Sequence, residues 1–377
     1  MPPRIAHCIL EPRYSGAEML VLGLARAQIA DGCSVAVIAL RPSDPTFLGE
    51  MQALGRLRCE LFVPARALVG QQRLSWIRRS CALFAPDVLF AHSLLPSLYS
   101  RLALVGNSKV SLATVLHADD DFDDVLVRAL ERLLWRKHSV VVGVSPASLR
   151  NYRARITAKQ NTRLIANGVE LEAVRAAAAQ RAWARQHIFN AAPDDIVLLQ
   201  VGRISVQKQQ RLSAAAVGLL RRHISLKNIK LFFAGPIEGE KYYRDIVTTA
   251  HALGIAGNIY FLGPCKDVPV LLAGADAHLM PSRWEAQGIA ALEALASGVF
   301  CVFTALEAFL PHQGLPGVEL LPEDATDTQL ADVLATAIHT SALTRRYTRE
   351  MENYGFERCA REYRDLANTL ANSHRIR

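Results

Sequence analysis

Residues 281–298 read PSRWEAQGIAALEALASG, and they are followed by VFCVFTA, which is typical of a buried strand. The preceding DAHLMPS is typical of a strand that ends near Pro281, RWEAQG is typical of a loop, and a helix is predicted to begin at Gly288 or the next residue. The segment therefore predicts strand, loop, helix and strand in succession. This succession is the repeating unit of a parallel sheet covered by helices.

The same succession recurs along all 377 residues. A first series of apolar runs comprises RIAHCIL, SVAVIAL, DVLFAHS, VSLATVLHA and SVVVGVS. A second series comprises IVLLQVG, IKLFFAG, NIYFLG, DAHLMPS and VFCVFT. Nearly continuous apolar strands that alternate with helices indicate parallel sheets buried on both faces. We expect an α/β protein with two doubly wound, Rossmann-like domains that face each other across a cleft, over residues 1–170 and 171–350. Residues 351–377 are predicted to form a final helix that crosses back toward the N-terminal domain.

The composition excludes some classes of protein. The chain is 51% hydrophobic and 21% charged, so global disorder is unexpected. Lys and Arg outnumber Asp and Glu by 43 to 35, which favours an anionic partner. No basic stretch is interleaved with stacking aromatic residues, so a nucleic-acid partner is disfavoured.

The cysteines and the apolar segments bear on the compartment. The seven cysteines are far apart and none has CxxC spacing, so we expect buried thiols in a reducing compartment. The first residues do not resemble a signal peptide, and the apolar runs are too short to span a bilayer. We expect a cytoplasmic protein, either soluble or peripheral at the inner face of the membrane.

Two cations follow the first strand of the second series. VLLQVGRISVQKQQ predicts a strand that ends at Gly202, with Arg203 and Lys208 before the next helix. Two cations at the mouth of a parallel sheet can clamp a diphosphate, Arg through its planar fork and Lys as a point charge. Spacing alone leaves open the alternative that both side chains are solvated on a turn.

Glu285 and Glu293 are the two carboxylates of the opening segment. If the chain rises at helical pitch over the eight steps from Glu285 to Glu293, it spans roughly 12 Å, about the reach from a hexose to a ribose across a diphosphate. Backbone N–H groups at the helix start favour an anion between them. The alternative is two exposed helix residues, but the flanking IAALEALA is apolar all round, and a buried carboxylate is costly without a partner.

The segment PSRWEAQGIAALEALASG resembles the motif of retaining glycosyltransferases of family 4, in which two glutamates are separated by seven residues after a Pro-Ser pair. VGRISVQK resembles the G-R-x4-K phosphate clamp of that family. Further resemblances, in the family's order, are YSGAEMLVLGLARAQIADGCSV, PDVLFAHS, TVLHADD, VGVSPASL, LIANGVE and GADAHLMPS. The resemblance runs from about residue 5 to the end of the chain and implies the GT-B fold.

The resemblance also implies roles for single residues. Glu285 would contact the donor sugar, Glu293 the ribose, and Arg203 and Lys208 the charge that grows on the leaving diphosphate. The catalytic residues would be these two cations, Glu285 and His117. The donor-binding residues would be Gly16, Gly202, Arg203, Lys208, Glu285, Ala286, Gln287, Gly288, Ile289 and Glu293.

The activity that the resemblance implies is a retaining, metal-independent transfer of a hexose from a nucleotide-diphosphate sugar, most simply a UDP-sugar. The acceptor would be a glycan or lipid-linked glycan in cell-surface polysaccharide biosynthesis, such as lipopolysaccharide. No cofactor and no metal are expected, and contact with a membrane surface is a further expectation. Two alternatives stay open: a nucleotide-sugar isomerase of GT-B fold, and an inactive scaffold subunit of a glycan-assembly complex.

The chain departs from the family pattern at four places. Ser15 replaces the first of two glycines, Gln209 replaces the glycine after the clamp lysine, and Ala286-Gln287 replaces Gly-Phe. The strand VFCVFTALEAF lacks the usual G-x-P-V-V and T-D-x-G-G. None of these changes removes a charged group with an implied role, but they put the shape of the donor-sugar pocket in doubt.

Three other features have competing interpretations. HADDDFDD offers Asp119, Asp120, Asp121, Asp123 and Asp124 as metal ligands, but acidic residues before the helix VLVRALERLLWRK are better explained as N-terminal capping. That helix is basic and apolar, as is SWIRRS, and either an interfacial helix or an ordinary surface helix fits. His92 ends a strand as His117 does, and a structural role is the simpler interpretation for it.

Overall fold

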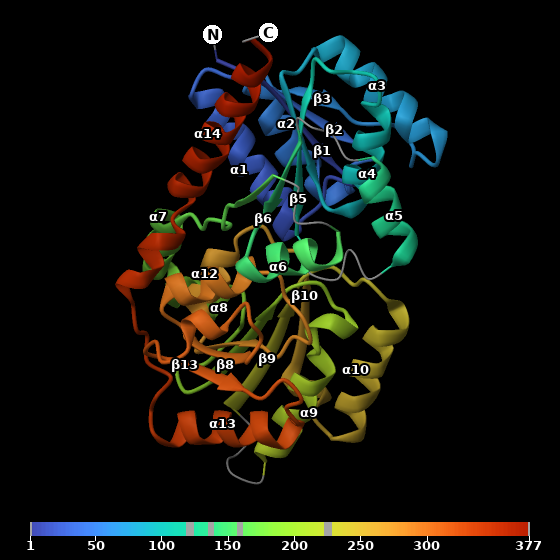
Figure 1. Ribbon diagram of the computed structural model, residues 1–377. Helices are drawn as coiled ribbons and strands as arrows, with labels where there is room; N and C mark the ends of the chain where they lie inside the picture. Colours follow the sequence, from blue (N-terminus) through green and yellow to red (C-terminus); the bar gives the residue numbers. More distant parts are fainter. Residues whose placement is uncertain (1, 118–123, 135–138, 157–160, 222–227, 376–377) are drawn as a thin grey trace. The chain divides into compact units, whose positions relative to one another are not determined.

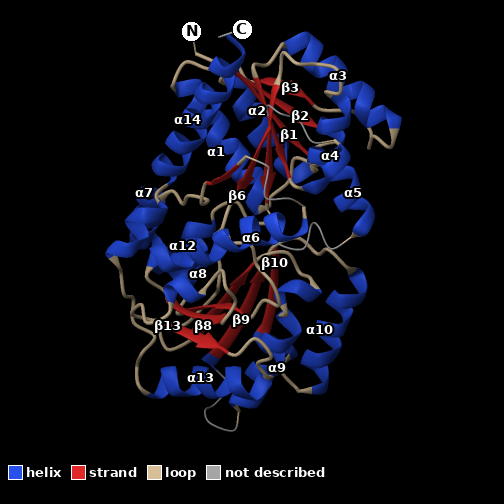
Figure 2. Ribbon diagram, in the orientation of Figure 1, coloured by secondary structure: helices blue, strands red, loops and turns tan. Residues whose placement is uncertain are grey.

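The computed structural model describes residues 2–117, 124–134, 139–156, 161–221 and 228–375. The chain forms two compact units. The N-terminal unit comprises residues 1–168 together with 356–377, and the C-terminal unit comprises residues 169–355. Each unit is built on a parallel sheet with helices on both faces (Figures 1 and 2).

The sheet of the N-terminal unit has the order β3-β2-β1-β4-β5-β6-β7 among the described residues. Its strands are β1 (Arg4–Ile9), β2 (Ser34–Ala39), β3 (Glu60–Phe62), β4 (Val88–His92), β5 (Ser111–Leu116), β6 (Ser139–Gly143) and β7 (Thr162–Leu164). Its helices are α1 (Gly16–Ala30), α2 (Leu48–Arg56), α3 (Gln71–Phe84), α4 (Leu94–Ala103), α5 (Val125–Leu133), α6 (Pro146–Arg155) and α14 (Phe356–Arg375), with a short 3-10 turn η1 (Pro45–Phe47).

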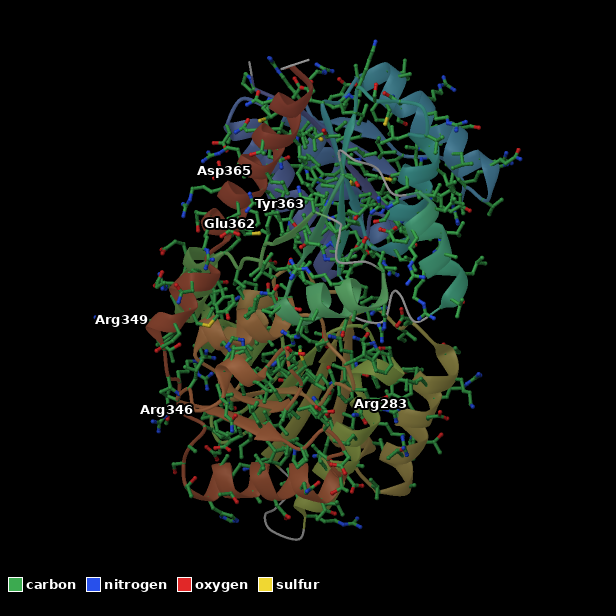
Figure 3. The ribbon with its side chains drawn as sticks, viewed as in Figure 1. Arg283, Arg346, Arg349, Glu362, Tyr363 and Asp365 are labelled. Atoms are coloured by element: carbon green, nitrogen blue, oxygen red, sulfur yellow. The ribbon has the colours of Figure 1, made fainter. Side chains whose placement is uncertain are left out.

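The two faces of this sheet are covered by different helices. Cys8, Leu89 and Ala91 share one buried cluster with Ile77 and Phe84 of α3. Residues that alternate with them in the strands face α1 and α14. Tyr363 lies on α14 (Figure 3). Its ring packs edge to face with that of Phe90, with ring centroids 5.5 Å apart. The C-terminal helix α14 is therefore part of the core of the N-terminal unit, although the whole C-terminal unit separates it from the rest in sequence.

The sheet of the C-terminal unit has the order β10-β9-β8-β11-β12-β13 among the described residues. Its strands are β8 (Ile196–Val201), β9 (Ile229–Ala234), β10 (Ile259–Gly263), β11 (Ala277–Met280), β12 (Phe300–Thr304) and β13 (Val318–Leu321). Its α-helices are α7 (Leu171–Ala177), α8 (Arg181–His187), α9 (Gln210–Leu220), α10 (Glu240–Ala252), α11 (Val268–Gly274), α12 (Ile289–Ser297) and α13 (Asp327–His339). Its 3-10 turns are η2 (Ala178–Gln180), η3 (Val206–Lys208), η5 (Ala256–Asn258), η6 (Leu310–His312) and η7 (Arg349–Tyr354).

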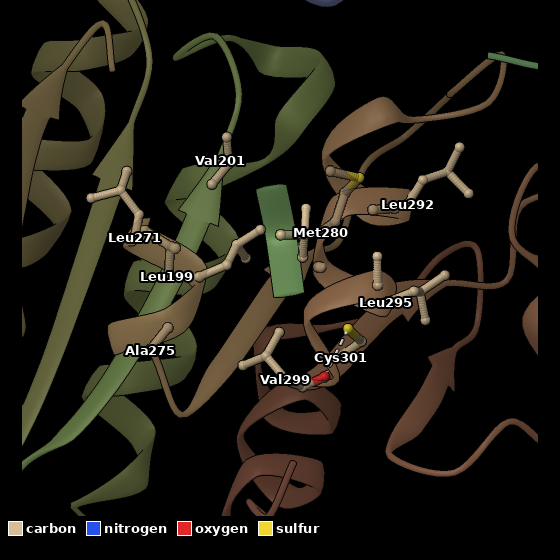
Figure 4. Close-up of a cluster of buried hydrophobic side chains, with 14 of the residues drawn as sticks. Leu199, Val201, Leu271, Ala275, Met280, Leu292, Leu295, Val299 and Cys301 are labelled. Atoms are coloured by element: carbon tan, nitrogen blue, oxygen red, sulfur yellow. Dashed lines mark hydrogen bonds between the residues drawn. The ribbon is translucent and has the colours of Figure 1, made fainter. Parts of the chain in front are cut away.

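Both faces of this sheet are covered by helices, which explains why its strands are mostly apolar. Leu199 and Met280 pack with Leu292 and Leu295 of α12 on one face (Figure 4). The intervening Leu198 joins the cluster under α9, α10 and α13 on the other face. This buried cluster holds α12 against one face of the sheet, and α12 follows the loop at the end of β11.

The structure confirms the predicted α/β class and each of the ten predicted strands. It adds three strands that the sequence patterns did not reveal, β3, β7 and β13, each of which lies at the edge of a sheet. The predicted final helix is shorter than expected. It begins at Phe356, because residues 349–354 form the 3-10 turn η7 and Gly355 separates the two.

The predicted capping before α5 is confirmed for Asp124. Its side chain accepts hydrogen bonds from the backbone N–H groups of Leu126 at 2.7 Å and Val127 at 3.1 Å. Asp119, Asp120, Asp121 and Asp123 lie outside the described residues. Trp76, in the SWIRRS segment, packs against the core cluster under α3.

The cysteines and the helix lengths bear on two further expectations. All seven cysteines are free thiols; six are buried and Cys265 is partly buried, as predicted. Among the residues that the structure describes, no helix is both long enough and apolar enough to cross a membrane.

Candidate functional site

The predicted phosphate clamp and the opening segment lie at one point of the C-terminal sheet. The loop after β8 carries Arg203 and Lys208, and the loop after β11 carries Glu285. These two strands are parallel neighbours, and from them the chain continues to β9 on one side and to β12 on the other. Such a reversal of strand order opens a crevice at the carboxyl ends of the strands, where ligands bind in this class of sheet.

Lys208 and Glu285 form an ion pair, so the structure brings together two residues that are 77 positions apart. The side chains are 12% and 7% exposed, and the hydroxyl of Ser282 donates a second hydrogen bond to the same oxygen, Glu285 Oε1, at 2.9 Å. Both contacts use Oε1, so neither of them occupies the second carboxylate oxygen. A carboxylate held in this way is fixed in orientation and keeps one oxygen for a ligand.

Arg203 lies beside this pair and is held by two other side chains. Its guanidinium forms an ion pair with Glu238 and donates a hydrogen bond to Gln207 Oε1 at 3.0 Å. The Arg203 side chain is 32% exposed, so it remains accessible to a ligand. Both predicted cations are therefore neutralised by glutamates within the chain, and Glu238 was not anticipated from the sequence.

The two loops are also joined by hydrogen bonds to backbone oxygens. The N–H of Arg283 donates to Gln207 O at 2.9 Å, and Gln207 Nε2 donates to Trp284 O at 2.8 Å. Gln209 Nε2 donates to Pro281 O at 2.9 Å. The loop after β8 is thus anchored to the loop after β11 on each side of Lys208, which fixes the geometry of the ion pair.

Gln200, on the buried strand β8, hydrogen-bonds the backbone of Lys208. It is 1% exposed, its amide nitrogen donates to the backbone oxygen of Lys208, and its amide oxygen accepts a hydrogen bond from Ser213 at 2.8 Å. Sequence reasoning missed this residue. An amide in an otherwise apolar strand was the available signal, because a buried polar side chain needs partners.

Gln209 has the backbone conformation that explains the family's preference for glycine. Its φ is +54°, in the left-handed region, and it caps the start of α9. A non-glycine residue pays about 1–2 kcal/mol in this region. The hydrogen bond from Gln209 to Pro281 O offsets part of that cost, so the departure from the family pattern keeps the clamp intact.

The start of α12 is shaped by two features. Gly288 has a φ of +74°, and a Cβ there would lie 2.9 Å from the ring of Phe309. Ala286 and Gln287 are buried, and Ile289 is the first residue of the helix.

The assumption of helical pitch from Glu285 onward is wrong, because residues 285–288 form a loop and only the part from Ile289 to Glu293 is helical.

Glu293 is the second carboxylate of the motif, and it differs from Glu285. It is partly buried on α12, where desolvation raises its pKa to about 7. Within the described part of the chain, no hydrogen bond or ion pair stabilises its charge. The structure therefore contradicts the alternative that both glutamates are simply exposed, and it leaves Glu293 as a carboxylate without a partner among the described residues.

Two of the predicted site residues, Gly16 and His117, belong to the N-terminal unit. Gly16 is exposed and is the first residue of α1, directly after Ser15. Ser15 has an extended backbone, with a φ of −150°, so this position does not require the glycine that the family usually has. His117 follows β5 directly, and its Nε2 lies 3.1 Å from Nδ1 of His92.

The sequence matches two family descriptions. Residues 14–173 match Glycosyltransferase Family 4, and residues 183–356 match Glycosyl transferases group 1. The chain belongs to glycosyltransferase family 4. The predicted two-domain GT-B fold is confirmed with it.

Several known proteins are similar to this family member. Lipopolysaccharide glucosyltransferase WaaG of Escherichia coli is 30% identical over 159 residues, which are 42% of this chain and 41% of WaaG. Sucrose-phosphate synthase from Thermosynechococcus elongatus has a TM-score of 0.80 at 17% identity, covering 98% of this chain and 100% of that one. Anabaena HepE in complex with UDP and glucose has a TM-score of 0.79 at 16% identity, covering 98% and 99%.

Proposed function

We propose that this protein is a retaining glycosyltransferase that moves a hexose from a UDP-sugar to a glycan or lipid-linked glycan in cell-surface polysaccharide biosynthesis. The observation that carries the proposal is the Lys208–Glu285 ion pair beside Arg203, at the switch point between β8 and β11. Family membership and the similarity to WaaG, a lipopolysaccharide glucosyltransferase, support the class of reaction and of acceptor.

The donor would bind by exchanging partners with the protein. Its diphosphate would replace Glu238 as the partner of Arg203 and Glu285 as the partner of Lys208. The carboxylate of Glu285 released in this way would accept hydrogen bonds from the sugar. Charge-assisted bonds to both cations would strengthen as negative charge builds on the leaving diphosphate, and this difference lowers the barrier.

The carboxylate of Glu293 would accept hydrogen bonds from the ribose hydroxyls. A partly buried carboxylate without a protein partner is stabilised when a ligand supplies donors, so donor binding would lower the pKa of Glu293 from about 7. In a retaining reaction of this kind the leaving phosphate oxygen would take the proton of the acceptor hydroxyl. No dedicated protein base and no metal would then be needed.

The experiment is a panel of UDP-sugars incubated with the protein, with UDP release followed in the presence and absence of oligosaccharide and lipid-linked acceptors. We expect acceptor-dependent release that persists in the presence of a chelator. Conversion of the sugar without any acceptor would favour the isomerase, and absence of nucleotide binding would favour the scaffold subunit. A strict requirement for Mg²⁺ or Mn²⁺ would contradict the metal-independent mechanism.

Matched variants distinguish the loss of a catalytic contact from the general effect of removing a charge. Lys208→Met and Glu285→Gln should each lower kcat by about 100-fold or more, as expected for a transition-state contact. Lys230→Met is the control, because Lys230 forms a similar pair with Asp195 at 3.2 Å, near the opposite ends of the strands. Activity of Lys208→Met near that of Lys230→Met would contradict the assignment.

A further inference from the structure

Three histidines of the N-terminal unit form a continuous chain of hydrogen bonds. His7 on β1 bonds Gln28 Oε1 of α1 through its Nε2 at 2.8 Å. Its Nδ1 lies 3.0 Å from Nε2 of His92, at the end of β4. Nδ1 of His92 lies in turn 3.1 Å from Nε2 of His117, directly after β5. The chain thus runs from α1 across three neighbouring strands to a residue with an implied role in catalysis.

The inner members of this chain are enclosed. His7, His92 and Gln28 are 0%, 2% and 1% exposed, whereas His117 is partly exposed. The His7 ring also stacks on Phe90, with ring centroids 5.4 Å apart. The chain is therefore held by packing as well as by hydrogen bonds, and only its His117 end is open to a ligand.

The rings of the chain are neutral at physiological pH. Burial lowers the pKa of His7 and of His117 to about 4. Burial, followed by the neighbouring His7 and His117, lowers the pKa of His92 well below its usual value. A neutral imidazole has one nitrogen that donates and one that accepts, so each bond in the chain fixes the direction of the next.

The amide of Gln28 sets that direction. Its oxygen accepts from His7 Nε2–H, so Nδ1 of His7 is an acceptor and must receive the Nε2–H of His92. Nδ1 of His92 is then an acceptor and receives the Nε2–H of His117. The remaining nitrogen, Nδ1 of His117, takes no part in the chain and carries a lone pair.

The chain does not conduct protons out of the site. Its inner end is an amide, which neither releases nor takes up a proton at accessible pH, so a proton that enters at His117 has no exit there. Positioning, rather than proton transfer, is the role that this arrangement supports.

We propose that Gln28, His7 and His92 are positioning residues that hold His117 as the neutral Nε2–H tautomer, with its Nδ1 fixed as a hydrogen-bond acceptor for a hydroxyl of a sugar substrate. The sugar part of this inference rests on the proposed function. The tautomer assigned to His117 depends only on the hydrogen bonds among Gln28, His7, His92 and His117.

Two-dimensional NMR of ¹⁵N-histidine-labelled wild-type protein tests the tautomer directly, because protonated and unprotonated ring nitrogens differ widely in chemical shift. We expect His7, His92 and His117 to be Nε2–H tautomers at pH 7. A Nδ1–H tautomer or a mixture at His117 would overturn the inference. This measurement does not depend on activity. A wrong tautomer would therefore be distinguished from a failure of the proposed function, which would appear as folded wild-type protein without sugar transfer.

Two variants then test the effect on the reaction. His92→Phe interrupts the chain while keeping a ring, and Gln28→Met removes the amide at nearly constant length. We expect either change to lower kcat by about 10- to 100-fold with little change in KM for the donor, and to give mixed tautomers at His117. Unchanged kcat and a fixed tautomer in folded Gln28→Met would overturn the inference, even if His92→Phe fails to fold.

His312→Phe is the matched control. His312 is 4% exposed, and burial lowers its pKa as well. It lies in the C-terminal unit and takes no part in the hydrogen-bonded chain of Gln28, His7, His92 and His117. We expect this change to alter the midpoint of urea unfolding without altering kcat or the tautomer of His117. An equal loss of kcat in His312→Phe would show that the effect of His92→Phe reflects lost packing.

Discussion

Replacement of Glu293 by glutamine should stabilise the protein and weaken donor binding at the same time. Desolvation raises the pKa of the folded-state carboxyl from 4.5 to about 7. Between these two pH values the folded state binds more protons than the unfolded state, so the free energy of unfolding falls as the pH rises through this window. A neutral amide at this position avoids the free-energy cost of desolvating a charged carboxylate.

The size of the effect follows from the two pKa values. Their difference corresponds to about 3 kcal/mol at 1.36 kcal/mol per pKa unit. Because the side chain is partly open to solvent, we expect Glu293→Gln to raise the free energy of unfolding by about 1–2 kcal/mol at pH 8. The gain should shrink as the pH falls from 7 through 4.5, because wild-type Glu293 is protonated in both states below that pH.

Urea unfolding at pH 5, 6, 7 and 8 measures this effect, and isothermal titration with UDP measures the loss of binding. We expect UDP affinity of the wild type to rise between pH 6 and 8, because the charged carboxylate accepts the ribose hydroxyls, and Glu293→Gln to bind about 10- to 100-fold more weakly at pH 8. The exposed Glu319 on β13 provides the control Glu319→Gln. A stability gain that is equal at pH 5 and pH 8, or UDP binding that is insensitive to pH, would refute the reasoning.

Three other changes test the loops around the site. Gly288→Ala should destabilise by about 1–3 kcal/mol in urea unfolding, because it adds a Cβ 2.9 Å from Phe309 at a φ of +74°, and a neutral result would contradict the observed geometry. Gln209→Gly should be about 1 kcal/mol more stable than Gln209→Ala, since both lose the bond to Pro281 O but only glycine relieves the φ of +54°; equal stabilities would argue against that conformation. Glu238→Gln should tighten UDP binding several-fold by releasing Arg203, and unchanged affinity in a titration would show that Arg203 does not contact the diphosphate.

The sequence patterns found ten apolar strands and missed three short strands at the sheet edges. The central strands β8 and β12 are continuous apolar runs, so they stand out. The missed strands β3, β7 and β13 are three or four residues long, lie at the sheet edges and are partly exposed. Edge strands of this length are fixed by pairing with a neighbour, and the local sequence carries little trace of that.

The site was predictable to the extent that its residues follow strands. Arg203, Lys208 and Glu285 were expected at one donor site because each follows a strand and matches a family motif, and the structure brings Lys208 and Glu285 together in an ion pair. Glu238 follows β9 and resembles any solvated glutamate in sequence, so its pairing with Arg203 depends on how three loops converge in space.

The two ion pairs at the clamp have a consequence for simple anions in solution. Lys208 and Arg203 are each already neutralised by a glutamate, so the empty clamp offers little net positive charge. A free phosphate or chloride ion that displaced one glutamate would leave a bare carboxylate behind and gain few contacts in exchange. A nucleotide sugar can compensate for both displacements at once, through its diphosphate and its hydroxyls. The clamp would thereby discriminate against abundant inorganic anions before any sugar is recognised.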